Sequence, residues 1–306
     1  MISRREFIAL AAASASVLRG KDRIGRSRIS AISDEVAASP EEAIAFTKQY
    51  GLQWLELRNV PGSKKPYFFM EPEELQSAAQ QFKSNNLRIS FLNTNLLKFG
   101  LPGTEPAART KDTAEARAKR ISREQAQFDR RSDDLRKCIR AAQAFGTQNV
   151  RVFTFSRVAQ PDKLFPRIAE ILEPMAKIAE NEGVRLLIEN EPSQNVGSSA
   201  ETAAMLKLLP PKAVGTNWDP LNAIGLETPF PDGYNLLPKD RIWNVQFKGK
   251  SILDTPQRLD WAAIVQALDK DGYAGEVGLE THYFDGTNIE KAHASMKEML
   301  RIVGAS

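Results

Sequence analysis

Four strand-like runs in the second half of the chain decide the fold: Leu186-Leu187-Ile188-Glu189, Val214-Gly215-Thr216-Asn217-Trp218-Asp219, Ile242-Trp243-Asn244-Val245-Gln246 and Val277-Gly278-Leu279-Glu280. Each run ends in a residue that can bind a metal ion, and these end residues lie 30, 27 and 34 positions apart. That spacing is long enough for one helix and one strand between successive end residues. Because successive strands of a parallel α/β barrel end at one shared mouth, we expect the four side chains to meet there.

Similar runs recur along the rest of the chain, with helical patterns between most of them. The eight expected strands cover 29–33, 53–57, 88–93, 149–155, 185–189, 214–218, 243–248 and 276–280. Ser39-Pro40 and Ser198 stand where helices would begin. The alternation predicts an α/β fold, a single-domain (β/α)8 TIM barrel over residues 29–306. An open doubly wound sheet is the alternative, although no Gly-x-Gly-x-x-Gly follows the first strand.

Two segments interrupt this regularity. Residues 104–134 are polar and densely charged, which is typical of a solvated helical face. The segment follows the third strand at the mouth, so a lid is the alternative interpretation. Residues 224–241 are rich in proline and glycine, which predicts that the sixth helix is reduced to a turn.

The charge distribution argues against nucleic acid as a partner. The chain has 306 residues, 42% of them hydrophobic and 26% charged, with a net charge of +4. Residues 1–28 alone carry +5, so the expected barrel carries −1. A nearly neutral barrel has no overall field to attract a phosphate backbone.

The basic N-terminal segment has the pattern of an export signal. Ser3-Arg4-Arg5-Glu6-Phe7-Ile8 is followed by an alanine-rich apolar stretch, and Ala13-Ser14-Ala15 offers a small-residue cleavage site. The pattern resembles a twin-arginine signal peptide, which implies the twin-arginine export machinery as a partner and a periplasmic location. The apolar stretch is shorter than the ~20 residues of a membrane span. If the arginine pair is accidental, the protein is cytoplasmic.

Three carboxylates at strand ends predict a metal site. Glu189, Asp219 and Glu280 would repel one another in one mouth unless a cation neutralises them or protons bind. Gln246 adds an amide oxygen at a fourth strand end. Oxygen ligands of this kind suit Mg²⁺ or Mn²⁺. Taken singly, each carboxylate could instead cap the helix that follows it.

Further polar residues near the strand ends are expected to bind a substrate. They are Glu56, Asn93, Asn222, Lys248 and His282. Lys248 follows Gln246 with a period of two, so both face the same side, where the ammonium could hold a carbonyl, hydroxyl or phosphate oxygen. His282 lies two residues beyond Glu280 and could carry protons or bind the metal. The alternatives are a rim lysine paired with a carboxylate, an ordinary loop histidine, and a Glu56 that is buried against Arg58.

Four motifs carry a family resemblance over the whole chain after the N-terminal segment. They are Leu187-Ile188-Glu189-Asn190, Asn217-Trp218-Asp219-Pro220-Leu221-Asn222, Val245-Gln246-Phe247-Lys248-Gly249 and Gly278-Leu279-Glu280-Thr281-His282. The chain resembles the xylose isomerase-like TIM barrels, a family of sugar phosphate isomerases and epimerases. In that family a Glu, an Asp, a His and a Glu hold one divalent metal, and the two glutamates act as acid and base. The resemblance implies Glu189, Asp219, Gln246 and Glu280 as metal ligands, with Glu189 and Glu280 catalytic.

The chain departs from the family pattern by losing histidines. Gln246 stands where the family usually has His, and this change favours Mg²⁺ or Mn²⁺ over Zn²⁺. Glu191 and Asn222 also stand where His is common in the family. The related DNA-repair endonucleases need several zinc-binding histidines, whereas this chain has two in total. The sequence therefore argues against a zinc nuclease.

The sequence favours a metal-dependent isomerase or epimerase that acts on a sugar. A lyase or dehydratase on a keto-sugar or glycoside derivative is the nearest alternative, because it begins with the same abstraction of a proton next to a carbonyl. The loss of histidines also leaves open a non-catalytic periplasmic sugar-binding barrel.

Overall fold

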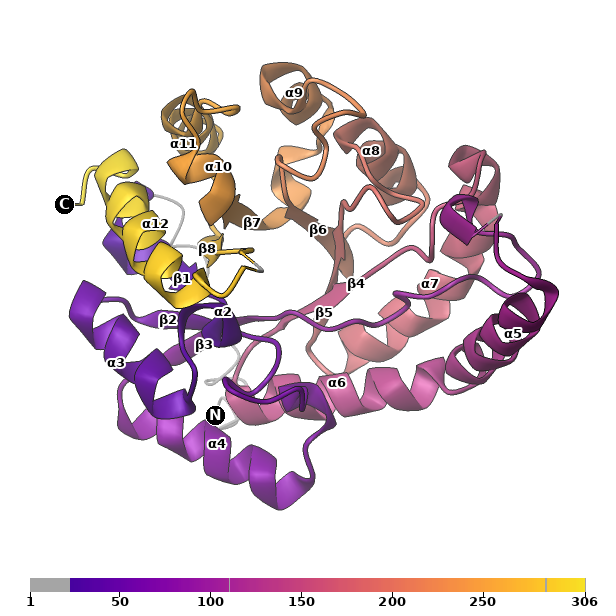
Figure 1. Ribbon diagram of the computed structural model, residues 1–306, viewed down its shortest axis with the longest axis horizontal. Coiled ribbons are helices and arrows are strands. Elements are labelled where there is room, and N and C mark those ends of the chain that lie inside the picture. Colours follow the sequence, from indigo (N-terminus) through magenta and orange to yellow (C-terminus); the bar gives the residue numbers. More distant parts are fainter. Residues whose placement is uncertain (1–22, 110, 284, 306) are drawn as a thin grey trace, which may run out of the picture.

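A ring of eight parallel strands surrounded by helices forms the molecule in the computed structural model, which describes residues 23–109, 111–283 and 285–305 (Figure 1). The strands are β1 (Ile29–Ala31), β2 (Trp54–Leu57), β3 (Arg88–Leu92), β4 (Asn149–Val152), β5 (Arg185–Glu189), β6 (Val214–Trp218), β7 (Ile242–Lys248) and β8 (Glu276–Glu280). They pair in the order β1-β8-β7-β6-β5-β4-β3-β2. A parallel bridge between Ile32 and Glu56 then joins β1 to β2 and closes the ring. The predicted (β/α)8 barrel is confirmed.

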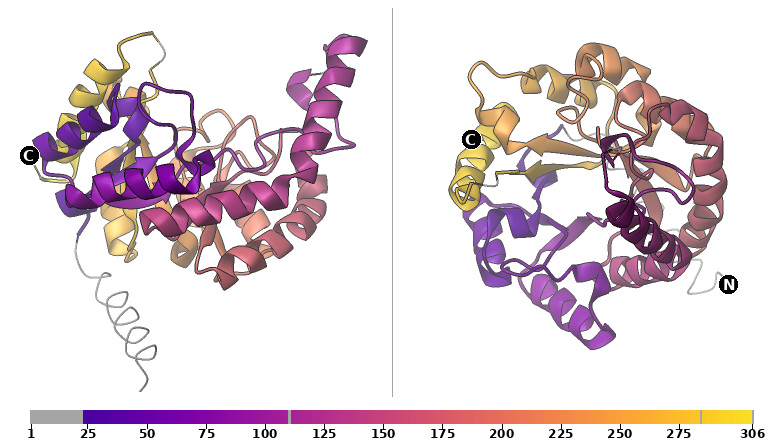
Figure 2. Two further views of the ribbon diagram at one scale, coloured as in Figure 1. Left: turned by 90° about the horizontal axis from the view of Figure 1, so that it is seen from below. Right: turned by 45° about the vertical axis from the view of Figure 1, so that its right-hand side comes forward.

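The helices follow the strands in sequence and lie outside the ring (Figures 1 and 2). They are α2 (Ser33–Val36), α3 (Pro40–Tyr50), α4 (Pro72–Ser84), α5 (Ala114–Asp129), α6 (Arg131–Phe145), α7 (Phe165–Asn181), α8 (Ser199–Lys207), α9 (Tyr234–Leu236), α10 (Gly249–Leu253), α11 (Trp261–Lys270) and α12 (Asn288–Ile302). Ser39 caps α3 by accepting a hydrogen bond from the amide of Glu42, as its place before Pro40 predicts. Ser198 and Glu201 form a capping box at α8.

The two sides of the strands differ in chemistry. Apolar side chains fill the layer between strands and helices, as where the rings of Phe247 and Trp261 stack with centroids 3.9 Å apart. Polar side chains such as Ser30, Glu56 and Asn217 are fully buried and hydrogen-bonded to other strands across the inside of the ring. The apolar layer stabilises the barrel, and the polar interior supports the side chains at its mouth.

The charged segment 104–134 is largely helical, and the Pro/Gly-rich segment 224–241 consists mostly of turns. α5 occupies most of the charged segment and extends away from the ring of strands, as the left view of Figure 2 shows. The buried guanidinium of Arg120 anchors α5 to the preceding loop by ion pairs to Glu105 and Asp112, and it also pairs with Glu124 one turn along the helix. A lid role for this segment stays a prediction. The Pro/Gly-rich segment contains the three-residue α9 and a turn at Pro229–Gly233, so the reduced sixth helix is confirmed.

The expected export signal and linker cover residues 1–28, of which residues 1–22 lie outside the described residues. β1 begins at Ile29, where the barrel was expected to start. Among the residues that the structure describes, no helix is long and apolar enough to cross a membrane.

Candidate active site

The ends of β5, β6 and β8 bring three of the four expected metal ligands together. Glu189 and Glu280 are the last residues of β5 and β8, and Asp219 directly follows β6. One carboxylate oxygen of each lies within 4.8 Å of the others, and all three side chains are buried. Above them opens a cavity of about 500 Å³, lined by Arg58, Asn59, Asn95, Lys98, Arg151, Glu189, Glu191, Pro192, Asn222, Lys248, Glu280 and His282.

Lys248 lies between two of these carboxylates. Its Nζ is 2.8 Å from Oε2 of Glu280 and 3.1 Å from Oδ2 of Asp219, and the residue is 4% exposed. Burial acts to lower the pKa of Lys248, but the facing carboxylates outweigh it and raise that pKa. Burial likewise acts to raise the pKa of Glu280, but Lys248 and His282 hold it well below its usual range. The lysine is therefore an ammonium ion built into the carboxylate cluster rather than a rim residue.

Arg151 of β4 holds the third carboxylate. Its Nη1 donates to Oε2 of Glu189 at 2.8 Å, and its other nitrogens donate to the backbone oxygens of Asn93 and Thr94. Sequence reasoning missed this residue. The available signal was a charged side chain inside the apolar run Val150–Phe153, where an ionised group needs a buried partner.

Two asparagines fix the position of Asp219. The side chain of Asn190 accepts a hydrogen bond from the amide of Asp219 at 2.8 Å and donates to its carbonyl oxygen at 2.7 Å. The backbone amide of Asn222 donates to Oδ1 of Asp219 at 3.1 Å. Asn222 also lines the cavity, and its contact with a substrate stays a prediction.

His282 links the cluster to the exposed rim. Its Nδ1 lies 3.1 Å from Oε1 of Glu280, its backbone amide donates to Oε2 of Glu35, and its side chain is 40% exposed. The residue has φ of +58°, a left-handed conformation that costs energy for a residue other than glycine. Arg58 lies beside it and pairs with Asp34 and Glu35. This arrangement suits a proton path between Glu280 and solvent.

Glu56 and Asn93 lie below the mouth rather than beside the cavity. Both are 0% exposed, and neither lines the space where a substrate would sit. Oε2 of Glu56 accepts a hydrogen bond from Asn93 at 2.8 Å and another from Gln246 at 2.6 Å. Burial raises the pKa of Glu56, while these hydrogen bonds act to lower it. Their placement differs from the expected direct contact with a substrate, because both side chains are turned into the barrel interior.

Gly278 of β8 leaves the room that Glu56 occupies. A Cβ at this position would lie 1.9 Å from Oε1 of Glu56, which is held by hydrogen bonds and cannot move aside. Gly278→Ala is expected to lower the free energy of unfolding by about 3 kcal/mol. Urea denaturation measures the change. A variant as stable as the parent would contradict the packing of Glu56 against β8.

The charges and the oxygen donors of the mouth fit a divalent cation. Six carboxylates face four basic side chains there, paired as Arg58 with Asp34 and Glu35, Lys98 with Glu191, Arg151 with Glu189, and Lys248 with Asp219 and Glu280. Oε1 of Gln246 is buried and accepts no hydrogen bond from the described residues, whereas the buried Oδ2 of Asp219 faces the ammonium of Lys248 at 3.1 Å. The excess of carboxylates over basic side chains and the free oxygen of Gln246 match the hard oxygen ligands that Mg²⁺ or Mn²⁺ prefers.

The protein without metal is expected to lose stability as pH rises from about 4 to about 7. Burial raises the pKa of Asp219 to about 7, from an ordinary value of 3.8. Between these pH values the folded chain keeps a proton that the unfolded chain has lost. The free energy of unfolding therefore falls as pH rises through this window, by up to about 4 kcal/mol for this group. Urea denaturation in the presence of a chelator, across this pH range, measures the trend.

Glu35 and Glu56 add to this fall in the free energy of unfolding with rising pH, because burial raises their pKa as well. Glu280 has a lowered pKa and so titrates below this window. A saturating divalent cation should reverse the trend, since a cation and a proton compete for Asp219. Stability that rises steadily with pH in the chelated protein would contradict this electrostatic description.

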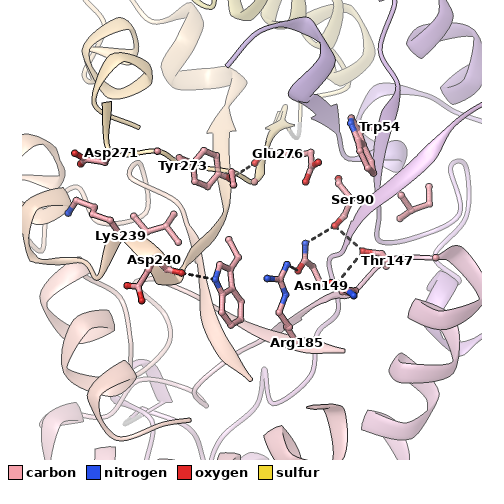
Figure 3. Close-up of a pocket in the computed structure, with 18 residues that line it drawn as sticks. Trp54, Ser90, Thr147, Asn149, Arg185, Lys239, Asp240, Asp271, Tyr273 and Glu276 are labelled. Carbon is pink, nitrogen blue, oxygen red and sulfur yellow. Dashed lines mark hydrogen bonds between the residues drawn. The ribbon is translucent and has the colours of Figure 1, made fainter. Parts of the chain in front are cut away.

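A larger cavity, of about 910 Å³, opens at the opposite end of the barrel (Figure 3). First residues of strands line it, among them Trp54, Asn149, Arg185 and Glu276. Arg185 donates to Asn149 and lies over the ring of Trp243. None of the expected site residues lines this cavity, and enzymes with this fold place their chemistry at the other end.

A family model described as xylose isomerase-like TIM barrel matches residues 44–302. The chain belongs to this family. The match covers β2 to β8 and therefore includes every expected metal ligand. No curated protein matches the sequence.

Solved structures share the fold at low sequence identity. The probable 3-DHS dehydratase AsbF, involved in petrobactin synthesis in Bacillus anthracis, superposes with a TM-score of 0.65 at 14% identity, over 89% of this chain and 98% of that one. D-allulose 3-epimerase from Methylomonas sp., solved with D-allulose, gives 0.63 at 14%, over 93% and 99%. The IolI protein, solved with zinc, gives 0.62 at 15%, over 90% and 98%. At these identities the similarities show the fold alone, and the neighbours include a sugar epimerase and a dehydratase.

Proposed function

We propose that this protein is a divalent-metal-dependent isomerase or epimerase that acts on a sugar. The observation that carries the proposal is the meeting of Glu189, Asp219 and Glu280 within 4.8 Å of one another at the mouth of the barrel. The same mouth has more carboxylates than basic side chains and a buried free oxygen on Gln246, which a cation would satisfy. The epimerase among the structural neighbours supports a sugar as the substrate class.

The residues that would hold the cation are Glu189, Asp219, Gln246 and Glu280. All four offer oxygen, which favours Mg²⁺ or Mn²⁺ over the zinc found in the IolI structure. When bound, such an ion supplies a Lewis acid that polarises a sugar carbonyl and acidifies the neighbouring C–H bond.

The chain itself supplies the proton transfers. Glu189 and Glu280 come from β5 and β8, on two sides of the cluster, so one can remove the proton and the other can return it. Lys248 presents N–H donors in the same place and would bind a carbonyl or hydroxyl oxygen of the sugar. Asn222 at the cavity wall adds a further donor for a hydroxyl group. His282 can pass a proton between Glu280 and solvent.

A dehydratase is the second candidate, and His282 is the observation that favours it. Loss of a β-hydroxyl group requires an acid near the leaving oxygen, and His282 is both half-exposed and in contact with Glu280. The dehydratase among the structural neighbours agrees with this option. NMR analysis of the product separates the two reactions, because elimination forms a new double bond and epimerisation does not.

Exchange of the proton next to the carbonyl tests the proposal. The purified protein would be incubated in D₂O with Mg²⁺ or Mn²⁺ and a panel of keto-sugars, and ¹H NMR would follow the signal of the C–H bond next to the carbonyl. Loss of that signal for at least one sugar is the expected result. If the protein binds sugars and metal but exchanges no proton across the panel, it is a binding protein and the proposal is wrong.

A further inference from the structure

The carboxylate of Glu56 is the centre of a polar network below the proposed metal site, and this inference rests on the proposed function. The residue is 0% exposed. Its donors are Ser30 Oγ at 2.9 Å, Asn93 Nδ2 at 2.8 Å, Gln246 Nε2 at 2.6 Å and Asn244 Nδ2 at 3.3 Å. Three of the four donors are therefore side-chain amides, contributed by strand β7 and by the residue that follows β3.

A carboxylate that accepts a hydrogen bond from a side-chain amide fixes the orientation of that amide. All four hydrogen bonds to the Glu56 carboxylate come from donors, so each neighbouring amide turns its NH₂ group toward Glu56 and its oxygen away. The oxygens of Asn93, Asn244 and Gln246 show this consequence. All three are buried and accept no hydrogen bond from the part of the chain that the structure describes. A buried acceptor without a hydrogen bond is unfavourable, so the orientation that Glu56 imposes on the three amides has an energetic cost.

Gln246 is the amide whose orientation matters for the metal site. It lies two residues before Lys248 on β7, so the two side chains share the inner side of the strand. Val245 pairs with Trp218 of β6, so Gln246 and Asp219, which follow them in sequence, lie side by side at the carboxylate cluster. With its NH₂ group held by Glu56, Gln246 has only its oxygen left to offer. A reversed amide would present N–H groups to a cation and repel it.

A second path connects Glu56 to another proposed ligand. Asn244 Nδ2 also donates to Oδ1 of Asn217 at 2.9 Å, and Nδ2 of Asn217 donates to Oε2 of Glu189 at 2.8 Å. Glu56 and Glu189 thus stand at the two acceptor ends of one chain of amides. Each amide in that chain has a defined direction, because the carboxylates at both ends accept hydrogen bonds from it.

We propose that Glu56 is a positioning residue that sets the amide of Gln246 so that its oxygen, not its nitrogen, serves as a metal ligand. The chain through Asn244 and Asn217 orients Glu189 by the same means. Partners of this kind behind the ligands typically change metal affinity by about 10- to 100-fold. The alternative is that Glu56 only holds strands together, in which case it changes stability and leaves the affinity of the folded protein unchanged.

Glu56→Gln tests the proposal, because it keeps the shape but can donate as well as accept. Mn²⁺ affinity would be measured by calorimetry on protein shown to be folded by circular dichroism. The expected result is binding weakened by about 10- to 100-fold for Glu56→Gln, against less than about threefold for the matched control Ser30→Ala. The control removes a hydroxyl donor from the same carboxylate without releasing an amide.

Folded Glu56→Gln with the affinity of the parent would overturn the proposal, and so would an equal loss in Ser30→Ala. If Glu56→Gln does not fold, Glu56→Asp gives the same readout, since its shorter carboxylate withdraws from the amides but keeps the charge. Equal Mn²⁺ affinity of parent and variant would overturn only the role of Glu56 and would leave the proposed metal site standing. A parent protein that binds no Mn²⁺ would overturn the proposed metal site as well.

Discussion

Replacing Glu280 or Glu189 by glutamine is expected to lower the rate of proton exchange by about 10²–10⁴-fold while the fold survives. Glutamine has the shape of glutamate but can neither remove nor return a proton at neutral pH. Both positions end strands whose pairing depends on the backbone, so the barrel should persist. The rates would be measured in D₂O at saturating Mn²⁺, with circular dichroism as the check on folding.

Glu124→Gln is the matched control for these two variants. Glu124 is buried and paired with Arg120, as the catalytic candidates are buried and paired, but it does not line the mouth cavity. It should lose stability without losing exchange activity. Full exchange activity in both Glu189→Gln and Glu280→Gln would show that neither carboxylate transfers the proton.

Replacing Lys248 by methionine should produce the second large effect, seen in the metal-free protein. The ammonium is the nearest positive charge to both Asp219 and Glu280, and its removal leaves two buried carboxylates facing each other. Removing one partner of a buried ion pair typically costs about 3–5 kcal/mol. Urea denaturation with a chelator should show that loss. Added Mn²⁺ should restore more stability to the variant than to the parent, because the cation takes over the missing charge.

Lys98→Met is the control for this experiment. Lys98 pairs with Glu191 at the rim, where its side chain is 35% exposed, so the change should cost less than about 1 kcal/mol. A Lys248→Met variant that is as stable as the parent in chelator would mean that the carboxylates do not need the ammonium. If Mn²⁺ stabilises variant and parent equally, the cation does not take over the charge of Lys248.

The sequence was sufficient to predict the barrel and the convergence of three carboxylates. Both follow from local pattern, since an apolar run predicts a strand and a parallel barrel turns every strand end to one mouth. Glu189, Asp219 and Glu280 stand at such ends, and no knowledge of distant contacts was needed to bring them together. The loss of the sixth helix was equally readable from its prolines and glycine.

Contacts across the barrel could not be predicted in this way. Period-two alternation indicated that Lys248 faces inward, but not that it lies between Asp219 and Glu280. Glu56 was expected at the substrate because it lies on a strand near the mouth, yet the small Gly278 across the ring gives it room to turn inward. Arg151 was missed for a similar reason, because its partner Glu189 is 38 residues away in sequence. Such pairings depend on the sizes of residues from different strands.

Elemental analysis of the purified protein, after dialysis against Mn²⁺ and removal of free metal, tests the central claim most directly. The parent chain should retain one ion per molecule, and Asp219→Asn, which keeps the shape of the residue but removes a ligand charge, should retain almost none. A parent protein without bound metal, or an Asp219→Asn variant that retains as much as the parent, would contradict a cation site at the ends of β5, β6 and β8.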